Sequence, residues 1–481
     1  MATPVEPLPL RLPRWLPARL RAAAAARPVV ARLLENASWL AGERVAVLAL
    51  AFFFNAWFVR ALGPAEYGRY SWAVSFAGLF GAIATLGMDS LVVRDLARTP
   101  DQAGEVLGTA QAMRLAAGAV AWVAASVAAL AFRDDGASRS LVAIVAASSL
   151  FLGAGVFELW FQARLATRGT SLGRVGVAVL VQLVRGALIL ASAPTWAFGL
   201  LYTAGNALVV AVALMLFLTT RAPEVRLRFS GSRARALARD TVPLALSALA
   251  IAVYLKVDQV MLVALVGDRE NGVYAPAAML SEIFYFLPVA IAASAFPVIV
   301  RAREELPAAD LDLRLQQFYD AMAALGYAVA VSMALLAGPI VGLLFGPAYG
   351  ETTGVLRVHV ASFLFTTLGI ARGRFLIADG RTWFAFASTA MGAGVNVVLN
   401  LVLIPRHGAL GAAWATVAAY ACANYLSGFL WRPAWPQSVM LTRSLLLPAR
   451  LALWGVATAS GALAKRLGGA AGRPGPPGGA P

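Results

Sequence analysis

The sequence predicts an all-α polytopic membrane protein made of two six-helix bundles related by internal duplication, with one extra apolar segment near the C-terminus. Of its 481 residues, 60% are hydrophobic and 13% are charged, a more apolar composition than soluble globular proteins have. The pattern Gly-x-x-Glu-x-Gly-x-Tyr begins at Gly63 and again at Gly267, 204 positions later, which is about the length of six membrane helices. Duplicated helical bundles are typical of secondary transporters.

Apolar runs of about 20 residues, long enough to cross a hydrocarbon core of about 30 Å, predict twelve membrane spans. The first half is expected to hold six, at 37–60, 70–93, 105–132, 140–163, 174–193 and 195–219. The second half is expected to hold the other six, at 241–266, 272–299, 317–345, 352–378, 382–404 and 408–431. A further apolar stretch, 444–463, is either a thirteenth span or an interfacial helix.

Composition shifts between these runs predict the domain organisation. In chain order we expect a basic cytoplasmic tail (1–35), an N-terminal six-helix bundle (36–220), an Arg-rich cytoplasmic linker (221–240), a C-terminal six-helix bundle (241–432), a thirteenth span or interfacial helix (433–463) and a disordered Gly/Pro-rich tail (464–481).

The net charge of +16 is sorted by membrane side. With the N-terminus inside, most arginines fall in cytoplasmic segments, and the outer loops hold only Arg69, Arg133, Arg139, Arg269 and Arg406. This asymmetry follows the positive-inside rule and predicts a cytoplasmic N-terminus. It also explains the basic charge without a nucleic-acid partner.

Several chemistries lack the residues they need. The two lysines, Lys256 and Lys465, do not follow a glycine, so the chain has no Walker A phosphate loop. Two histidines and the single Cys422 do not make a zinc site of the usual kind. The loops between spans are too short for an extramembrane catalytic domain. The sequence therefore predicts a transporter, not an enzyme, and no cofactor.

Several blocks of the sequence together resemble one family. They are RALGPAEYG at 60–68, LGMD at 86–89, VRDLA at 93–97, KVDQ at 256–259, GVYA at 272–275, and NVVLNLVLIP at 396–405 with Gly408, Gly411-Ala412-Ala413 and Ala415-Thr416. In this order and spacing they resemble the Wzx-type polysaccharide flippases, which serve O-antigen, capsule and exopolysaccharide synthesis within the multidrug/oligosaccharidyl-lipid/polysaccharide exporter (MOP) superfamily.

The resemblance implies a flippase that moves oligosaccharide linked to undecaprenyl diphosphate across the bacterial cytoplasmic membrane by alternating access. It implies contact with membrane lipids and with other polysaccharide assembly proteins, and a proton or sodium ion as the candidate coupling ion. Two alternatives stay open. One is a cation-coupled drug or metabolite antiporter of the same superfamily, and the other is a membrane glycan polymerase or ligase.

Ionisable residues inside spans are the candidate site, because a charge at the bilayer centre costs at least about 2.5–3.5 kcal/mol. Lys256 and Asp258 lie near the middle of the seventh span, and their repeat counterparts are Phe52 and Phe54, so the fold does not require these charges. Their spacing of two residues places them on different helix faces, and each should find partners on other helices. Glu282 in the eighth span is the expected partner of Lys256, as part of a functional site or as a structural ion pair.

Arg185 in the fifth span is the best cation of the first half for a diphosphate, because guanidinium groups bind phosphate oxygens as a bidentate fork. The secondary candidates, which either face the substrate or snorkel to lipid headgroups, are Arg44, Arg357, Arg372 and Arg374.

Polar residues near these cations complete the candidate set. Asn396 and Asn400 stand one turn apart and either bind sugar hydroxyls or join helices. Asp89 and Glu158, near the predicted cytoplasmic ends, either bind the coupling ion or are paired with Arg94 or Arg164. His359 is expected to be a satisfied polar group.

Overall fold

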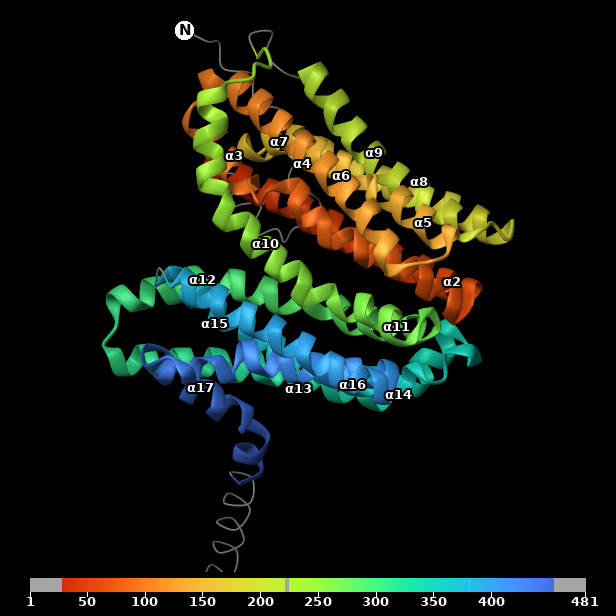
Figure 1. Cartoon of the computed structure of the whole chain (residues 1–481). Coiled ribbons are helices and arrows are strands. Elements are labelled where there is room, and N and C mark those ends of the chain that lie inside the picture. Colours follow the sequence, from red (N-terminus) through yellow and green to blue (C-terminus); the bar gives the residue numbers. More distant parts are fainter. Residues whose placement is uncertain (1–27, 221–224, 380, 454–481) are drawn as a thin grey trace, which may run out of the picture. The chain divides into compact units, whose positions relative to one another are not determined.

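The computed structural model describes residues 28–220, 225–379 and 381–453, and all regular secondary structure in these residues is helical (Figure 1). The α-helices are α2 (Pro28–Thr85), α3 (Asp89–Arg98), α4 (Ala103–Phe132), α5 (Gly136–Ala146), α6 (Ser148–Ala154), α7 (Val156–Ala163), α8 (Arg168–Leu190), α9 (Thr195–Thr220), α10 (Gly231–Val266), α11 (Asp268–Glu282), α12 (Phe286–Glu305), α13 (Ala308–Phe345), α14 (Thr352–His359), α15 (Ser362–Ala378), α16 (Thr382–Asn424) and α17 (Trp435–Leu445). Short 3-10 turns are η1 (Pro100–Gln102), η2 (Ile283–Tyr285), η3 (Pro347–Tyr349), η4 (Leu426–Leu430) and η5 (Arg432–Ala434).

Within the described residues, ten helices are long and apolar enough to cross a membrane, which agrees with the predicted all-helical polytopic protein. Two of the ten, Ser38–Arg98 and Trp383–Asn424, each cover two predicted spans. The reason is local: α2 continues through a kink at Gly63, and α16 continues through a kink at Gly408. Ten continuous helices therefore stand where twelve spans were expected.

The C-terminal segment is only partly described. The helix α17 has 11 residues, fewer than a membrane crossing needs, and it is not among the ten candidate spans. The remainder of the 444–463 stretch from residue 454 onward, the tail 464–481 and the N-terminal residues 1–27 lie outside the described residues. The choice between a thirteenth span and an interfacial helix stays a prediction.

The chain forms two compact units. Unit 1 comprises the described residues up to 283 together with 333–360 and 389–419, and unit 2 comprises 284–332, 361–388 and the described residues from 420 onward. The predicted linker at 221–240 lies within unit 1, and the two predicted bundles stay a prediction.

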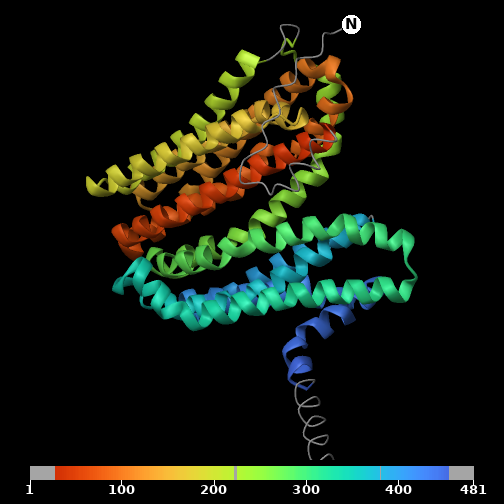
Figure 2. The ribbon, with the colours of Figure 1, turned by 180° about the vertical axis from the view of Figure 1, so that it is seen from behind.

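The kinked helix α2 is the central element of unit 1. It packs against α4, α8, α10 and α11, and Figures 1 and 2 show α2, α4, α8 and α9 as long neighbouring rods. Trp72 and Phe76 of α2 form a buried cluster with Val260 and Val263 of α10. A second cluster joins α3, α4, α7 and α9 around Met88, Trp160 and Phe217. Both clusters bring helices together that are distant in sequence.

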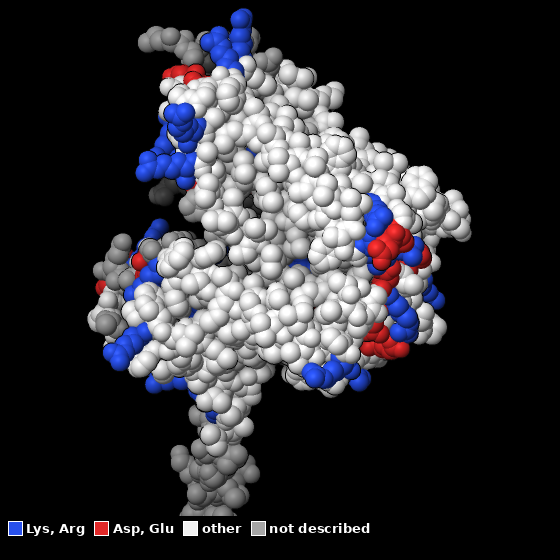
Figure 3. Space-filling view, in the orientation of Figure 1, with Lys and Arg blue, Asp and Glu red and all other residues white. Residues whose placement is uncertain are grey.

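The helix α4 shows how residue size is sorted between interior and exterior. Ala121, Ala125 and Ala129 are completely buried, while Val120 and Val127 are well exposed. Small residues let helix backbones approach closely where lipid removes the hydrophobic driving force between helices. Large apolar side chains on the outside are compatible with lipid contact, and large areas of the surface in Figure 3 carry no charge.

Unit 2 has a core of its own, built from α12, α13, α15 and α17. Tyr319, Met322 and Leu368 are buried there with Leu441 of α17. The hydroxyl of Ser444 donates to Asp320 at 2.7 Å, so α17 is tied to α13 by a polar contact as well as by apolar packing.

The repeated pattern has a structural explanation. Gly63 and Gly267 both adopt a positive φ, 73° and 100°, which favours glycine at these helix breaks. Gly68 and Gly272 allow α2 and α11 to cross at close range. A methyl group at Gly68 would lie 1.8 Å from the Asp268 carbonyl oxygen, and one at Gly272 would lie 1.7 Å from that of Pro64.

This crossing predicts that Gly272→Ala destabilises the protein. The added methyl group meets backbone that cannot move without separating α2 from α11, so we expect a loss of about 1–3 kcal/mol, measured by thermal unfolding in detergent. Gly78→Ala, in α2 with nothing within 4 Å of the new methyl group, is the matched control and should be neutral or slightly stabilising. Equal effects of the two substitutions would contradict the close crossing.

Candidate functional site

Asp258 of α10 lies at the centre of a buried polar network. Its carboxylate accepts hydrogen bonds from the hydroxyls of Tyr274 and Thr416, each at 2.7 Å, and from Nδ2 of Asn400 at 2.9 Å. Asp258 is 3% exposed, and within the described part of the chain no lysine or arginine forms an ion pair with it. A buried carboxylate held by neutral donors is chemically suited to bind a proton or a monovalent cation.

The two predicted asparagines belong to this network. Nδ2 of Asn400 also donates to Oδ1 of Asn396 at 3.0 Å, and both side chains are fully buried. In the described residues, Nδ2 of Asn396 and Oδ1 of Asn400 have no hydrogen-bond partner. Of the two roles expected for these amides, the contacts favour positioning Asp258 and joining helices over reaching an open sugar site.

Lys256 lies on a different face of α10 and pairs with Glu282 of α11, with 3.5 Å between Nζ and Oε2. The predicted partner is therefore the observed one, and Lys256 and Asp258 do not pair with each other. The Lys256 side chain is 36% exposed and that of Glu282 is 28% exposed. Partial exposure leaves both charges accessible to a ligand, unlike the enclosed Asp258.

Arg185 of α8 is held by neutral groups. Its Nη1 donates to Oδ1 of Asn55 at 2.6 Å, and its guanidinium lies 5.2 Å from the centre of the Phe58 ring. Phe58 is itself packed between Tyr70 and Phe198. Among the described residues no carboxylate forms an ion pair with Arg185, so its charge remains available to an anionic ligand.

The two carboxylates near the predicted cytoplasmic ends are paired, but not with the expected arginines. Asp89 pairs with Arg114 of α4 at 2.6 Å, whereas Arg94 pairs with Asp95. Asp89 and Arg94 are five residues apart and do not share a helix face. Asp89 therefore pairs with Arg114 of a neighbouring helix instead.

Glu158 shows the same correction. It contacts Arg174 of α8, which also binds Glu43 of α2, whereas Arg164 stacks 3.9 Å from the Trp160 ring. The Arg174 side chain is 17% exposed, so this three-residue cluster is largely enclosed. Its contacts favour a structural role for Glu158 over ion coupling.

The secondary arginines lie in different surroundings. Arg44 and Arg357 are exposed on α2 and α14 of unit 1. In unit 2, Arg374 is half-buried, and Arg372 is buried with Nη2 donating to the Ser427 hydroxyl at 2.9 Å and to the Ala423 carbonyl at 3.2 Å. Arg372 therefore takes part in helix packing. His359 is a satisfied polar group as expected, with Nδ1 2.6 Å from the Ser281 hydroxyl.

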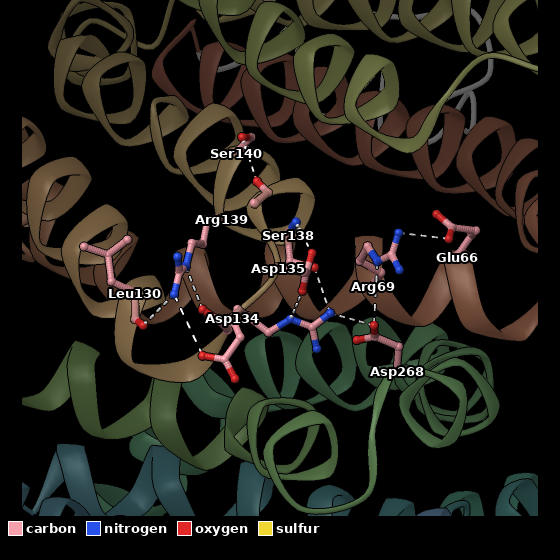
Figure 4. A network of polar contacts seen from close by, with 11 residues as sticks. Glu66, Arg69, Leu130, Asp134, Asp135, Ser138, Arg139, Ser140 and Asp268 are labelled. Carbon is pink, nitrogen blue, oxygen red and sulfur yellow. Dashed lines mark hydrogen bonds and ion pairs between the residues drawn. The ribbon is translucent and has the colours of Figure 1, made fainter.

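Three of the five arginines in the predicted outer loops, Arg69, Arg133 and Arg139, take part in one network of polar contacts in unit 1. In Figure 4, Arg69 lies between Glu66 and Asp268, at 3.0 and 3.6 Å. Arg133 also contacts Asp268, at 2.7 Å. Asp268 thus joins the second copy of the repeat to two arginines of the first half of the chain. Figure 3 shows acidic and basic side chains gathered together at the place where Figure 1 labels α2 and α5.

A separate exposed pair lies on the second half of the chain. Arg269 forms two hydrogen bonds of 3.0 Å with Glu351, and these bonds hold the pKa of the Glu351 carboxyl below its usual range. A lowered carboxyl pKa means that the stabilisation is present at neutral pH and is lost as the pH falls through that pKa.

A family model described as "Polysaccharide biosynthesis protein" matches residues 33–303, more than half of the chain. The chain belongs to this family. The match includes the first copy of the repeat, the linker, Lys256, Asp258 and Glu282.

Curated relatives of this family member match over shorter stretches. The uncharacterized membrane protein YabM of Bacillus subtilis is 31% identical over 153 residues, which is 31% of this chain and 28% of YabM. The uncharacterized membrane protein MJ1068 of Methanocaldococcus jannaschii is 29% identical over 92 residues, 19% of this chain and 18% of that protein. The alignments span less than a third of either relative.

Solved structures show the fold of this polysaccharide biosynthesis protein over most of its length. The lipid II flippase MurJ matches with a TM-score of 0.65 at 13% identity, covering 85% of this chain and 90% of MurJ. An inward-facing multidrug resistance MATE family transporter of the MOP superfamily matches with a TM-score of 0.66 at 16% identity, covering 82% and 95%. The protein therefore has the fold of MurJ and of the MATE transporters.

Besides Arg114 and Arg174, sequence reasoning missed Tyr274, Thr416 and Asn55 as partners of the site residues. Tyr274 is the last residue of the second repeat copy, and Thr416 lies in the last resembling block, so both were visible as pattern positions but not as ligands of Asp258. Asn55 is a polar residue within the first apolar run, a signal that would have placed it beside the candidate cation in the fifth span.

The cluster around Arg174 predicts a specific stability effect. Arg174→Gln leaves Glu43 and Glu158 close together without their shared cation, and we expect a loss of about 2–4 kcal/mol by thermal unfolding in detergent. The double variant Arg174→Gln/Glu158→Gln removes one of the two carboxylate charges and should recover part of the loss. Arg164→Gln, which loses only a contact with the Trp160 ring, is the control; a loss as large as that of Arg174→Gln would contradict the assignment.

Proposed function

We propose that this protein is a flippase that moves oligosaccharide linked to undecaprenyl diphosphate across the bacterial cytoplasmic membrane for surface polysaccharide synthesis. The match to the polysaccharide biosynthesis family over residues 33–303 carries the proposal. The fold shared with a lipid II flippase supports a lipid-linked substrate. The N-terminus is on the cytoplasmic side in this proposal, because the arginines are concentrated in the segments on that side.

Two six-helix bundles, 36–220 and 241–432, rock against each other in the proposed alternating-access cycle. Matching contacts of the repeated glutamates support a duplicated scaffold. Glu66 of the first copy contacts Thr195 at the start of α9. Glu270 of the second copy accepts a hydrogen bond from the Ala409 amide, after the α16 kink, at 2.8 Å. Equivalent glutamates thus bind the start of a helical segment in each half. In the cycle, the crossing of α2 and α11 opens when the outer side opens.

The substrate diphosphate binds Arg185 and Lys256 in this mechanism. Arg185 has only neutral partners among the described residues, and Lys256 can exchange Glu282 for a phosphate at modest cost because the pair is partly exposed. Arg44, Arg357, Arg372 and Arg374 remain secondary candidates. An anion that moves outward across an inside-negative membrane gains roughly 2.3 kcal/mol per charge per 100 mV, which favours export.

Asp258 is the proposed coupling group, with a proton or sodium ion as its ligand. Its enclosed position and neutral donors, including Asn400, separate it from the exposed cation Lys256, so ion and substrate have distinct sites on the same helix. The same arrangement suits the second candidate function, a cation-coupled drug or metabolite antiporter, which the likeness to MATE transporters favours.

The sidedness of lipid-linked oligosaccharide in a null strain tests the function. We expect inner-leaflet accumulation, detected with a membrane-impermeant glycan probe on oriented vesicles, and rescue by wild type. The neutral pair Lys256→Met/Glu282→Gln keeps the two side chains matched but removes the phosphate-binding cation, so flipping should fall at least about tenfold, a loss of about 1.4 kcal/mol.

Arg269→Met/Glu351→Gln, an exposed ion pair that shares no residue with the Lys256–Glu282 pair, is the matched control and should flip normally. Full flipping by Lys256→Met/Glu282→Gln would show that this ion pair has a structural role and does not bind the substrate. Normal outward display in a null strain without a second flippase would refute the proposed substrate and favour the antiporter.

Asp258→Asn tests the coupling site. Sodium chloride should raise the unfolding temperature of the purified wild type relative to choline chloride at equal ionic strength, because a bound ion stabilises the folded state by about 1.4 kcal/mol at tenfold excess over its Kd. The variant should show no such difference. Equal responses of both proteins would exclude Asp258 as the sodium ligand, and a wild type indifferent to sodium whose flipping follows the pH gradient would assign a proton.

A further inference from the structure

Unit 1 contains a cavity of about 650 Å³, a volume in the range of small-molecule binding pockets. Three connections between helices surround it: the kink of α2, the start of α5 and the turn from α8 to α9. None of the residues of the proposed diphosphate and ion sites lines it. The cavity is therefore distinct from the proposed sites of the transported headgroup and the coupling ion.

One side of the cavity carries a pair of opposite charges. Oε1 of Glu66 lies 3.0 Å from Nη1 of Arg69, and Oε2 of Glu66 accepts from the Thr195 hydroxyl. The side chains of Glu66 and Arg69 are 42% and 32% exposed, so both remain accessible. Arg69 contacts Glu66 through Nη1 and Asp268 through Nε, and within the described residues its Nη2 makes no hydrogen bond. A ligand at this side thus meets a carboxylate and free guanidinium donors a few ångströms apart.

Apart from Ser140, Ser192 and Thr195, the remaining wall is apolar. Leu141 and Ile144 of α5 face the cavity together with Leu188 and Ile189 of α8 and Phe198 of α9. Apolar residues continue beyond it on the outside of the same helices, where Leu190 is 78% exposed and Leu200 is 52% exposed. A hydrocarbon chain can therefore run from the cavity onto the lipid-facing surface without crossing a polar region.

The cavity lies at the level where candidate spans end. Gly136, Leu190 and Thr195, each the terminal residue of a candidate span, mark this level, and the exposed Trp196 lines the cavity beside them. Tryptophan is enriched at the boundary between hydrocarbon and headgroups. Figure 4 shows Glu66 pointing away from Asp268, so it does not take part in the contact between the two copies of the repeat.

We propose that this cavity binds a zwitterionic phospholipid with a primary ammonium group. The ammonium contacts Glu66, the phosphate accepts hydrogen bonds from Nη2 of Arg69, and one acyl chain lies on the wall formed by Ile144 and Leu188. An anionic lipid without an ammonium leaves Glu66 facing its headgroup, and like charges at short distance repel. The proposal is independent of the transported substrate.

The test uses the full-length protein, delipidated in detergent and titrated with phosphatidylethanolamine, phosphatidylglycerol or phosphatidylcholine of matched chains, with bound lipid counted by native mass spectrometry. We expect one tightly bound phosphatidylethanolamine, held at least about tenfold more tightly than phosphatidylglycerol, with phosphatidylcholine between them. Equal retention of the three lipids would overturn the proposal, because it would indicate only non-selective surface lipid.

Two variants locate the site. Ala137→Trp fills the cavity from an exposed position on α5 and should abolish the selective binding, while Ala131→Trp, exposed on α4 outside the cavity, should leave it unchanged. Ser140→Leu is a second filling variant if Ala137→Trp does not fold, as judged by its melting curve. Selective binding that survives a folded filling variant would place the lipid elsewhere.

Glu66→Gln separates charge from shape. The amide oxygen can still accept from Arg69 and the amide nitrogen can donate to the Thr195 hydroxyl, but the neutral side chain does not attract an ammonium, so the preference for phosphatidylethanolamine over phosphatidylglycerol should vanish while total lipid retention persists. An unchanged preference would overturn the assignment of Glu66. Because the readout is lipid binding, the result does not depend on whether the protein flips oligosaccharide.

Discussion

The close backbone crossing of α2 and α11 is the contact on which the arrangement of unit 1 depends. It requires glycine at positions 68 and 272. The side-chain amide of Asn271 also donates a hydrogen bond to the Gly68 carbonyl at 2.8 Å. In a lipid environment helices gain little from burying apolar surface against each other, so close packing and polar contacts between backbones have to hold them together. The crossing provides both, and it also brings Asp268 of the second half to the arginines of the first.

Charges inside the spans are handled in two different ways. Asp258 is enclosed by neutral donors, whereas Lys256, two residues earlier, is paired and partly exposed. A lone enclosed carboxylate is expensive unless it is hydrogen-bonded, and its energy changes strongly when a cation or proton arrives. Separating a partly exposed ion pair costs little free energy. One helix thus carries an enclosed carboxylate and a partly exposed cation on different faces.

Part of the candidate site followed from the sequence. Lys256, Asp258 and Glu282 were identifiable because a charge in an apolar run is costly and because the repeat has phenylalanine or glycine at the equivalent positions. The predicted partners of Asp89 and Glu158, which are their neighbours in sequence, are wrong. The arginines that bind these two carboxylates come from other helices. Long side chains within reach across a helix interface outcompete neighbours on another face of the same helix.

The sequence by itself determined the helical class, the approximate positions of the spans and the repeated glycines, because hydrophobic length and the need to satisfy backbone groups in lipid leave few alternatives. The tertiary structure decided where helices continue through Gly63 and Gly408, which polar side chains meet Asp258, and that Glu66 and Arg69 border a cavity. The network around Asp258 and the cavity arise from contacts between segments up to 158 residues apart. Local composition carries no information about such distances, whereas the packing of helices in three dimensions fixes them.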